Sequence, residues 1–243
     1  MVEPISSMPT QQPDEIDVTF DLKGVIKGAK LILPIALGVA TYGLVFGVLA
    51  QQAKLTVLEV LLMSSLVYAG SAQLVVLSLW ISPLPIGIII LTTLIVNARN
   101  LLMGVAISPW FRQLSPLKAY TTLFFLTDEN WALTMSKFSQ GESNAALLLG
   151  SGLVLCAAWV SSTVVGRLLG NIVHDPERWG LDFAFTAVFL ALLVPLWKGK
   201  SNLLPWIVAA IVAVAAAYWL PGKWYILLGG LAGSVVGGLR HAD

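Results

Sequence analysis

Charged side chains are scarce in this chain of 243 residues. Asp, Glu, Lys and Arg together make up 11% of it and hydrophobic residues 57%, whereas about a quarter of an average soluble domain is charged. This composition excludes an ordinary soluble domain and indicates a membrane protein. The formal net charge is only +1 and the cations form no long run. The chain therefore lacks the clustered positive charge with which proteins bind nucleic acid.

Cysteine is almost missing, and the common catalytic motifs are missing altogether. Cys156 is the single cysteine, which excludes an intrachain disulfide or a metal site built from cysteines. The sequence contains no Gly-x-x-x-x-Gly-Lys-Ser/Thr phosphate loop, no Gly-x-Ser-x-Gly elbow and no His-Glu-x-x-His pair. These absences argue against an ATP-driven pump and against hydrolase chemistry. We therefore expect no enzyme activity, no metal site and no cofactor.

Long apolar runs occupy most of the chain after its polar start. A helix of about 20 apolar residues crosses a bilayer core of about 30 Å, and backbone polar groups in lipid must be bonded within the protein. The alternating pattern of a membrane barrel is absent, so we predict an all-α, polytopic transmembrane helical bundle of about seven or eight spans. The predicted spans are Leu31–Ala50, Leu58–Trp80, Ile86–Ile107, Lys118–Ser136, Ala145–Leu169, Leu181–Trp197, Leu203–Leu220 and Trp224–Leu239.

The first 21 residues are polar and acidic and contain three prolines. Such a segment has too little apolar surface to offset the entropy of ordering, so we predict a mobile tail over residues 1–21 and a single transmembrane transport domain over residues 22–243. Lys23, Lys27 and Lys30 follow at a spacing that lets their ammonium groups reach lipid headgroups from one helix face. This cluster predicts a cytoplasmic N-terminus for a multi-pass protein of the cytoplasmic membrane.

Small and polar residues interrupt the second span in the segment MSSLVYAGSAQ. An unwound stretch at Ala69–Ser71 would turn free amides and carbonyls toward a substrate, as discontinuous helices do in many secondary carriers. The alternative is that these small residues only let neighbouring helices approach. On the first interpretation, the substrate-binding candidates are Tyr68, Gly70, Ser71 and Gln73.

Glycine or proline residues also occur inside the first and last predicted spans. Pro34 and the glycines after it predict a second helix break, which would add Tyr42 and Gly43 to the substrate site. Gly43 and Gly47 also form a Gly-x-x-x-Gly pair, for which close helix packing is the alternative role. A half-helix N-terminus at either break favours an anionic group such as an amino-acid carboxylate. Three glycines share one face of the last span and predict that a second helix, of this chain or of a partner, packs closely there: Gly229, Gly233 and Gly237.

Polar residues lie in the middle of the third span, in the segment NARN. An ionisable side chain deep in a bilayer costs at least about 2.5 to 3.5 kcal/mol on insertion scales, and a functional hypothesis is therefore the first to consider. Asn97 and Asn100 share a helix face and are further substrate-binding candidates, while Arg99 points away from Asn100. The alternative is a helix break whose cation pairs with a carboxylate for assembly.

The fourth span contains two adjacent carboxylates, Asp128 and Glu129, in the segment LTDENWALT. Consecutive helical positions diverge by about 100°, so we expect one carboxylate to pair with Arg99 and the other to face a cavity or water. A carboxyl group buried without a cation partner can hold a proton at neutral pH and release it when its cavity opens. The alternative is a short polar turn between two half-spans. Asp182 begins the sixth span, either to stabilise the helix N-terminus or to lie near a bound ammonium group.

The segments VYAGSAQ, NARN, LTDENWALT and GLDFAFTAVFLALLVP occur in this order, and together they resemble the AzlC family of branched-chain amino acid permeases. The resemblance spans roughly Pro34 to Pro195. It implies export or permeation of leucine, isoleucine or valine across the cytoplasmic membrane, commonly with a small hydrophobic AzlD-type partner subunit. The position after the arginine is often histidine in the family and is Asn100 here, which moves a proton-carrying role to Asp128 or Glu129. The matching positions are Tyr68, Gly70, Ser71, Gln73, Asn97, Arg99, Asp128, Glu129 and Asp182.

We therefore expect a secondary transporter, acting as an exporter of branched-chain or other small apolar amino acids and coupled to protons. Its substrate would lie near the bilayer midplane, between the broken first and second spans and the polar segments of the third and fourth. The candidates for ion pairing and coupling are Arg99, Asp128, Glu129 and Asp182. Two alternatives stay open. A passive channel needs no carboxylate that changes protonation, and a non-transporting membrane subunit would only scaffold an assembly.

Overall fold

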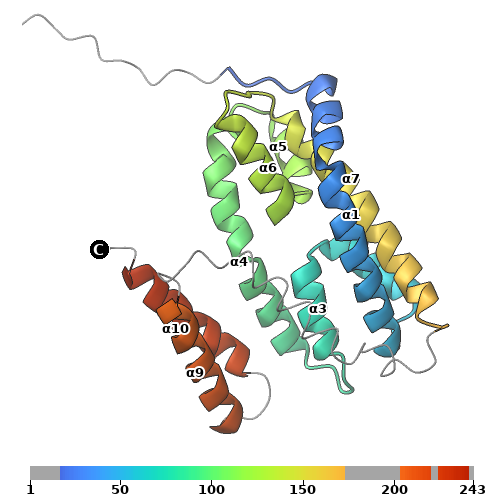
Figure 1. The fold of residues 1–243 in the computed structure, drawn as a ribbon, viewed down its shortest axis with the longest axis vertical. Coiled ribbons are helices and arrows are strands. Elements are labelled where there is room, and N and C mark those ends of the chain that lie inside the picture. Colours follow the sequence, from blue (N-terminus) through green and yellow to red (C-terminus); the bar gives the residue numbers. More distant parts are fainter. Residues whose placement is uncertain (1–16, 173–202, 220–223, 241–243) are drawn as a thin grey trace, which may run out of the picture. The chain divides into compact units, whose positions relative to one another are not determined.

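The computed structural model describes residues 17–172, 203–219 and 224–240, and every regular element in these ranges is a helix (Figure 1). This confirms the all-α class predicted from the apolar runs. The chain divides into two compact units. Unit 1 comprises Met1–Leu33 and Met103–Val154, and unit 2 comprises Pro34–Leu102 and Leu155–Asp243.

Three helices in the described ranges are long and apolar enough to cross a membrane. They are α1 (Leu22–Gln52), α4 (Ile86–Phe111) and α7 (Ala146–Leu169), which correspond to the first, third and fifth predicted spans. Each of them contributes one part to each unit. The seventh and eighth predicted spans form α9 (Leu203–Trp219) and α10 (Trp224–Arg240). The sixth lies outside the described residues, and the count of seven or eight stays a prediction.

The second and fourth predicted spans are each broken in the middle. The second consists of α2 (Val57–Leu62), the π-helical turn η1 (Met63–Val67) and α3 (Gly70–Ser78), all in unit 2. The fourth consists of α5 (Pro116–Phe124) and α6 (Asp128–Phe138), both in unit 1. The predicted break in the second span is therefore confirmed. The fourth span also divides into two half-spans, but the break lies at residues 125–127, and Asp128 and Glu129 belong to the first turn of α6.

The predicted break in the first span is wrong. α1 runs without interruption from Leu22 to Gln52, with Pro34 inside it. A proline removes one backbone hydrogen bond, but helices in membranes tolerate it where neighbouring helices support the segment. α7 gives this support, because it packs against α1 on both sides of the proline, at Gly28 in unit 1 and at Gly43 in unit 2.

Glycines bring α1 and α7 into backbone contact. In unit 1, a Cβ atom on Gly28 would overlap the α7 backbone. In unit 2, a Cβ atom on Gly43 would overlap the hydroxyl group of Ser162, and one on Gly47 would overlap the α7 backbone as well. In unit 2, Gly43 meets Ser162 and Gly47 meets Thr163 and Gly166, so the two helices run in the same direction and side by side there (Figure 1). Close contact of this kind drives helix association in lipid, and the packing role of the Gly-x-x-x-Gly pair is confirmed.

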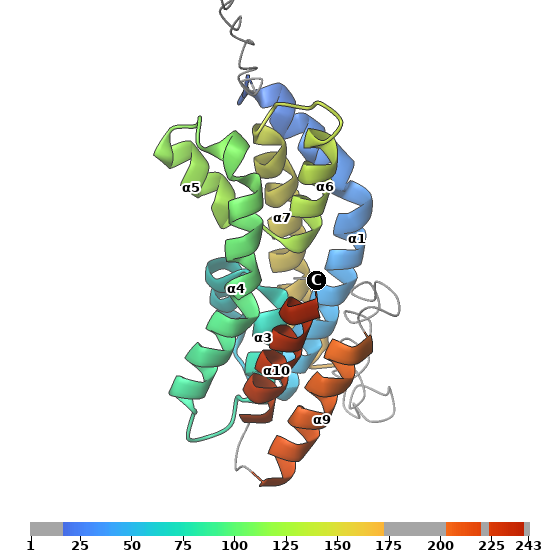
Figure 2. The same cartoon turned by 90° about the vertical axis from the view of Figure 1, so that its left-hand side faces the viewer.

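α9 and α10 form a helical hairpin, and the glycine face predicted in the last span lies against α9 (Figure 2). A Cβ atom on Gly229 would lie 2.8 Å from the Cβ of Ala213, and one on Gly233 would lie 2.9 Å from the Cβ of Ala209. The row continues at Gly237, where a Cβ atom would lie 3.9 Å from the Cβ of Pro205 in α9. The helix that packs on this face therefore belongs to this chain.

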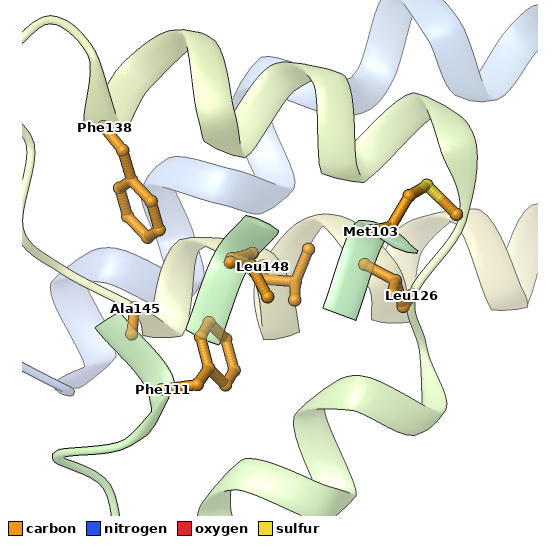
Figure 3. Packing of buried hydrophobic residues seen from close by; sticks show 7 residues of the cluster. Met103, Phe111, Leu126, Phe138, Ala145 and Leu148 are labelled. Carbon is orange, nitrogen blue, oxygen red and sulfur yellow. The ribbon is translucent and has the colours of Figure 1, made fainter. Parts of the chain in front are cut away.

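Unit 1 has its own apolar core, which joins α4, α6, α7 and the turn between α5 and α6. Its buried members are Met103, Ile107, Phe111, Leu126, Phe138, Ala145 and Leu148 (Figure 3). Trp110 lies at the edge of this cluster and stacks on Phe138, with ring centroids 4.4 Å apart. Because the members come from segments far apart in the sequence, this core fixes the two half-helices α5 and α6 within the unit.

Polar contacts join the start of α1 to the loop before α7. Asp21 accepts hydrogen bonds from the backbone N–H of Gly24 at 2.9 Å and from the side chain of Asn144 at 2.7 Å, and these bonds lower its pKa. Lys27 donates to Glu142, which lowers the pKa of that carboxyl group. An isolated β-bridge between Thr19 and Asn144 lies beside these contacts. The last residues of the segment predicted as a mobile tail are therefore bonded to the rest of unit 1.

Replacing Gly47 by alanine tests the contact between α1 and α7. The added methyl group would overlap the carbonyl oxygen of Thr163, so the helices must separate, and overpacking of this kind costs about 1 to 3 kcal/mol. We expect a lower midpoint of thermal unfolding for the purified protein in detergent. Gly38→Ala is the matched control, because Gly38 lies on the same helix with nothing within 4 Å of an added Cβ atom. Its midpoint should stay the same or rise slightly, and equal midpoints for the two variants would contradict the packing.

Candidate functional site

The break in the second span is built from uncommon backbone conformations. η1 is a π-helical turn, a feature found frequently at functional sites. The residue that follows it is Tyr68, whose φ of 45° is left-handed and is rare for a bulky residue. Ala69 follows in a non-helical conformation, and α3 begins at Gly70. The unwound residues are thus Tyr68 and Ala69 rather than the predicted Ala69–Ser71, because Gly70 already belongs to the first turn of α3.

The N-terminus of α3 has no side-chain cap within the described part of the chain. Its N-cap residue is Ala69, which carries no side-chain oxygen. The first N–H groups of a helix have no partner inside the helix and form the positive end of its dipole. Arg99 of α4 adds a cation at this place, since its Nη2 donates to the hydroxyl group of Ser71 at 2.9 Å. Amide groups and a guanidinium group together make this end of α3 attractive to an anion.

Gln73, one turn further along α3, is bonded at both ends of its side-chain amide. Its Nε2 donates to the hydroxyl oxygen of Ser64 in η1 at 3.3 Å. Its Oε1 accepts a hydrogen bond from Nε1 of Trp159 in α7 at 3.1 Å. Gln73 is only 1% exposed and Ser64 is fully buried, and buried networks of this kind are costly to disturb. The network therefore holds η1, α3 and α7 in a fixed relation across the helix break.

Aromatic rings fill the space around the break. The indole of Trp159 contacts the rings of Tyr42 and Phe46 in α1, with centroids 5.4 and 5.6 Å apart. The same indole covers Gly70, because a Cβ atom there would lie 2.9 Å from its Cη2 atom. Three predicted site residues, Tyr42, Gly70 and Gln73, thus meet around one tryptophan.

The break between α5 and α6, in contrast, is capped. The backbone N–H of Asn130 donates to the hydroxyl group of Thr127 at 3.4 Å, and its Oδ1 accepts from the N–H of Thr127 at 2.8 Å. Its Nδ2 donates to the carbonyl oxygen of Phe125 at 2.7 Å. Asp128 and Glu129 occupy the first turn of α6, where the helix dipole favours negative charge. The backbone groups freed by this break are therefore bonded by the protein itself.

Further predicted site residues lie on α4 and on α6. Asn97 and Asn100 are half-buried on α4. The bond of Arg99 to Ser71 lies within unit 2, whereas both carboxylates of α6 belong to unit 1. The predicted ion pair between Arg99 and one of them stays a prediction. Asp182 lies outside the described residues.

Trp159 and Asn130 are absent from the residues predicted as the site. Tryptophans at the ends of spans anchor a protein at the membrane interface, but Trp159 lies in the interior of the fifth predicted span. A buried indole N–H usually needs an acceptor, and a mid-span tryptophan therefore signals a polar partner such as Gln73. Asn130 follows two charged residues in the sequence, yet it is fully buried, because capping the break requires its side chain.

Known proteins resemble this chain over most of its length. The family model described as "AzlC protein" matches residues 34–173. An Archaeoglobus fulgidus protein named "Uncharacterized membrane protein" is 30% identical over 72% of this chain and 76% of its own. The Escherichia coli "Inner membrane protein YgaZ" is 27% identical over 87% of this chain and 86% of its own. The Bacillus subtilis "Branched-chain amino acid transport protein AzlC" is 23% identical over 80% and 76%. No solved structure matches the chain.

Replacing Gln73 by methionine tests the network around the break. The substitution preserves the approximate length of the side chain but leaves the buried indole N–H of Trp159 without its acceptor, which costs about 1 to 3 kcal/mol. For a chain of this size, we expect the midpoint of thermal unfolding to fall by about 2 to 4 °C per kcal/mol. Gln140→Met, at an exposed position in the turn after α6, is the control and should leave the midpoint unchanged. An unchanged midpoint for Gln73→Met would show that the network contributes nothing to stability.

Proposed function

We propose that this chain, which belongs to the AzlC protein family, is a secondary carrier that exports branched-chain and other small apolar amino acids across the cytoplasmic membrane. The family match over residues 34–173 covers three of the four sequence segments that carry the resemblance. The Bacillus subtilis relative is named for branched-chain amino acid transport. The family is thus associated with transport rather than catalysis, and the phosphate loop of an ATP-driven pump is missing from the sequence.

The observation that carries this proposal is the uncapped N-terminus of α3 next to Arg99. An amino acid crosses a membrane as a zwitterion, so a carrier must offer its carboxylate group a substitute for water. The first-turn N–H groups of α3, which begin at Gly70, provide donors at the positive end of a helix dipole. The guanidinium group of Arg99, bonded to Ser71, lies beside them. We assign the substrate carboxylate to this place.

The ammonium group of the substrate needs acceptors, and the other half of the broken helix supplies them. η1 ends at Val67, directly before the break, and the last carbonyl groups of a helix form the negative end of its dipole. The two ends of one broken helix thus offer opposite partial charges to a zwitterion. Tyr68 lies between them, while Asn97 and Asn100 on α4 are further candidates for contact with the substrate. Asp182 is a candidate for the ammonium group on its sequence position alone.

We assign proton coupling to Asp128 or Glu129. Both lie in the first turn of α6, at the helix break of the fourth predicted span, and an ionisable group inside a membrane span is costly and is usually retained for function. A carboxyl group can take up a proton on one side of the membrane and release it on the other when its surroundings change. This assignment distinguishes a coupled carrier from a passive channel, which needs no change of protonation.

The orientation and the partner are part of the same proposal. Lys23, Lys27 and Lys30 at the start of α1 favour a cytoplasmic N-terminus. The family resemblance suggests a small hydrophobic AzlD-type subunit as a partner in the membrane. A scaffold subunit that transports nothing would need this partner but would show no flux of its own in the assembled complex.

Leucine counterflow in proteoliposomes tests the carrier function and its carboxylate site. We expect internal leucine to stimulate uptake of labelled leucine, because a carrier exchanges substrates whereas a pore does not. Arg99→Gln should raise the half-saturating leucine concentration about tenfold or more, since hydrogen bonds to charged groups are worth about 1.5 to 3 kcal/mol.

Arg112→Gln is the control for that variant, because Arg112 is an exposed residue immediately after α4. Its half-saturating concentration should match the wild type. Uptake without stimulation by internal leucine would indicate a channel, and no flux even with the partner subunit present would indicate a scaffold. An unchanged half-saturating concentration in Arg99→Gln would remove this residue from the site.

The variants Asp128→Asn and Glu129→Gln test proton coupling. At least one of them should abolish the dependence of leucine flux on an imposed proton gradient while preserving counterflow, because exchange needs no net proton movement. Glu142→Gln serves as the control, since this carboxyl group lies in the loop before α7 and is bonded to Lys27. A proton-gradient dependence identical to the wild type in both α6 variants would exclude these carboxylates as the coupling groups.

A further inference from the structure

We propose that Trp159 limits the size of the side chain that this carrier accepts. The proposal rests on the carrier function above and extends it to the selectivity of the site. It concerns a residue of α7 that lies opposite the first turn of α3, in the same compact unit.

The position of the indole relative to the carboxylate site carries the argument. A Cβ atom on Gly70 would lie 2.9 Å from Cη2 and 3.2 Å from Cζ2 of Trp159. Gly70 is also the first residue of α3, whose N–H groups are assigned to the substrate carboxylate. In an α-amino acid, the side chain is attached to the carbon atom next to the carboxylate. The side chain of a bound substrate therefore starts within a few bonds of the place that this indole covers.

The walls of this place are apolar and densely packed. Trp159 is 4% exposed and Phe46 is fully buried, and the ring of Tyr42 packs against the indole, with its Cε1 atom 3.3 Å from the position of a Cβ atom on Gly70. Such walls suit an aliphatic side chain, because apolar surface is favourably buried against apolar surface. None of these three side chains carries a charge that would select an acidic or basic amino acid.

The indole is held in one orientation, as a size limit requires. Its Nε1 donates to Gln73, and Gln73 in turn donates to Ser64. A mobile ring could swing aside for a larger substrate, but a ring tied by a buried hydrogen bond must break that bond first. The network thus converts the bulk of Trp159 into a limit on side-chain volume, and Gln73 acts as the positioning residue.

A competition panel in leucine counterflow tests the proposal. Valine, leucine, phenylalanine and tryptophan would compete with labelled leucine in the wild type and in Trp159→Leu. We expect phenylalanine and tryptophan to compete poorly in the wild type and about tenfold or more better, relative to leucine, in Trp159→Leu, because hydrophobic pockets discriminate by about 10- to 200-fold per methylene group. Trp131→Leu is the matched control, since this tryptophan also donates through Nε1, to the carbonyl of Met103 in unit 1. It should leave the order of competitors unchanged.

Two smaller changes keep the test decisive if Trp159→Leu does not fold. Trp159→Phe replaces the indole by a smaller ring and should also improve competition by phenylalanine and tryptophan relative to leucine. Gly70→Ala adds a methyl group toward the indole and should have the opposite effect, so that valine, the smallest competitor of the panel, competes about tenfold better relative to leucine. An unchanged order of competitors in the folded variants, with leucine counterflow intact, would overturn the role of Trp159 and leave the carrier function standing. Absence of leucine counterflow in the wild type would overturn both.

Discussion

Backbone groups inside a bilayer have no water to bond, and this constraint governs how the two broken helices of this protein are built. At the break between α5 and α6, Thr127 and Asn130 bond the freed groups. At the break between η1 and α3, no side chain in the described ranges caps the helix, and Tyr68 is left-handed. Strained backbone persists only where its surroundings hold it. Here the surroundings include the hydrogen bonds of Gln73. Under the proposed mechanism, the first-turn N–H groups of α3 donate to the anionic group of the substrate.

The frame that holds this break is the contact between α1 and α7. In lipid the hydrophobic effect does not draw helices together, so the close approach allowed by glycine supplies the attraction. Within unit 2 that contact sets Trp159 between the rings of α1 and Gly70 of α3. A shift of α7 by one helical turn, about 5.4 Å, would carry the indole away from both. Helix packing and the proposed selectivity therefore depend on one register.

The two breaks also differ in their electrostatic character. The start of α3 combines a positive helix end with the cation of Arg99. The start of α6 places Asp128 and Glu129 at a positive helix end, where the charges partly offset each other. Under the proposed mechanism, this difference separates the two tasks of a coupled carrier, because one break attracts an anionic substrate group while the other holds the groups that exchange protons.

The sequence by itself determined the class and the position of the long helices, because apolar length and backbone satisfaction in lipid are local properties. It also located the break after η1 to within two residues. The helix break predicted at Pro34 is wrong for the same reason. A proline is a local signal, which says nothing about the neighbouring helix that supports the segment around it. Only the tertiary structure decided which residues meet. Gln73 and Trp159 are 86 positions apart, and their pairing follows from the packing of α3 against α7, for which a pattern of 3.6-residue period carries no information.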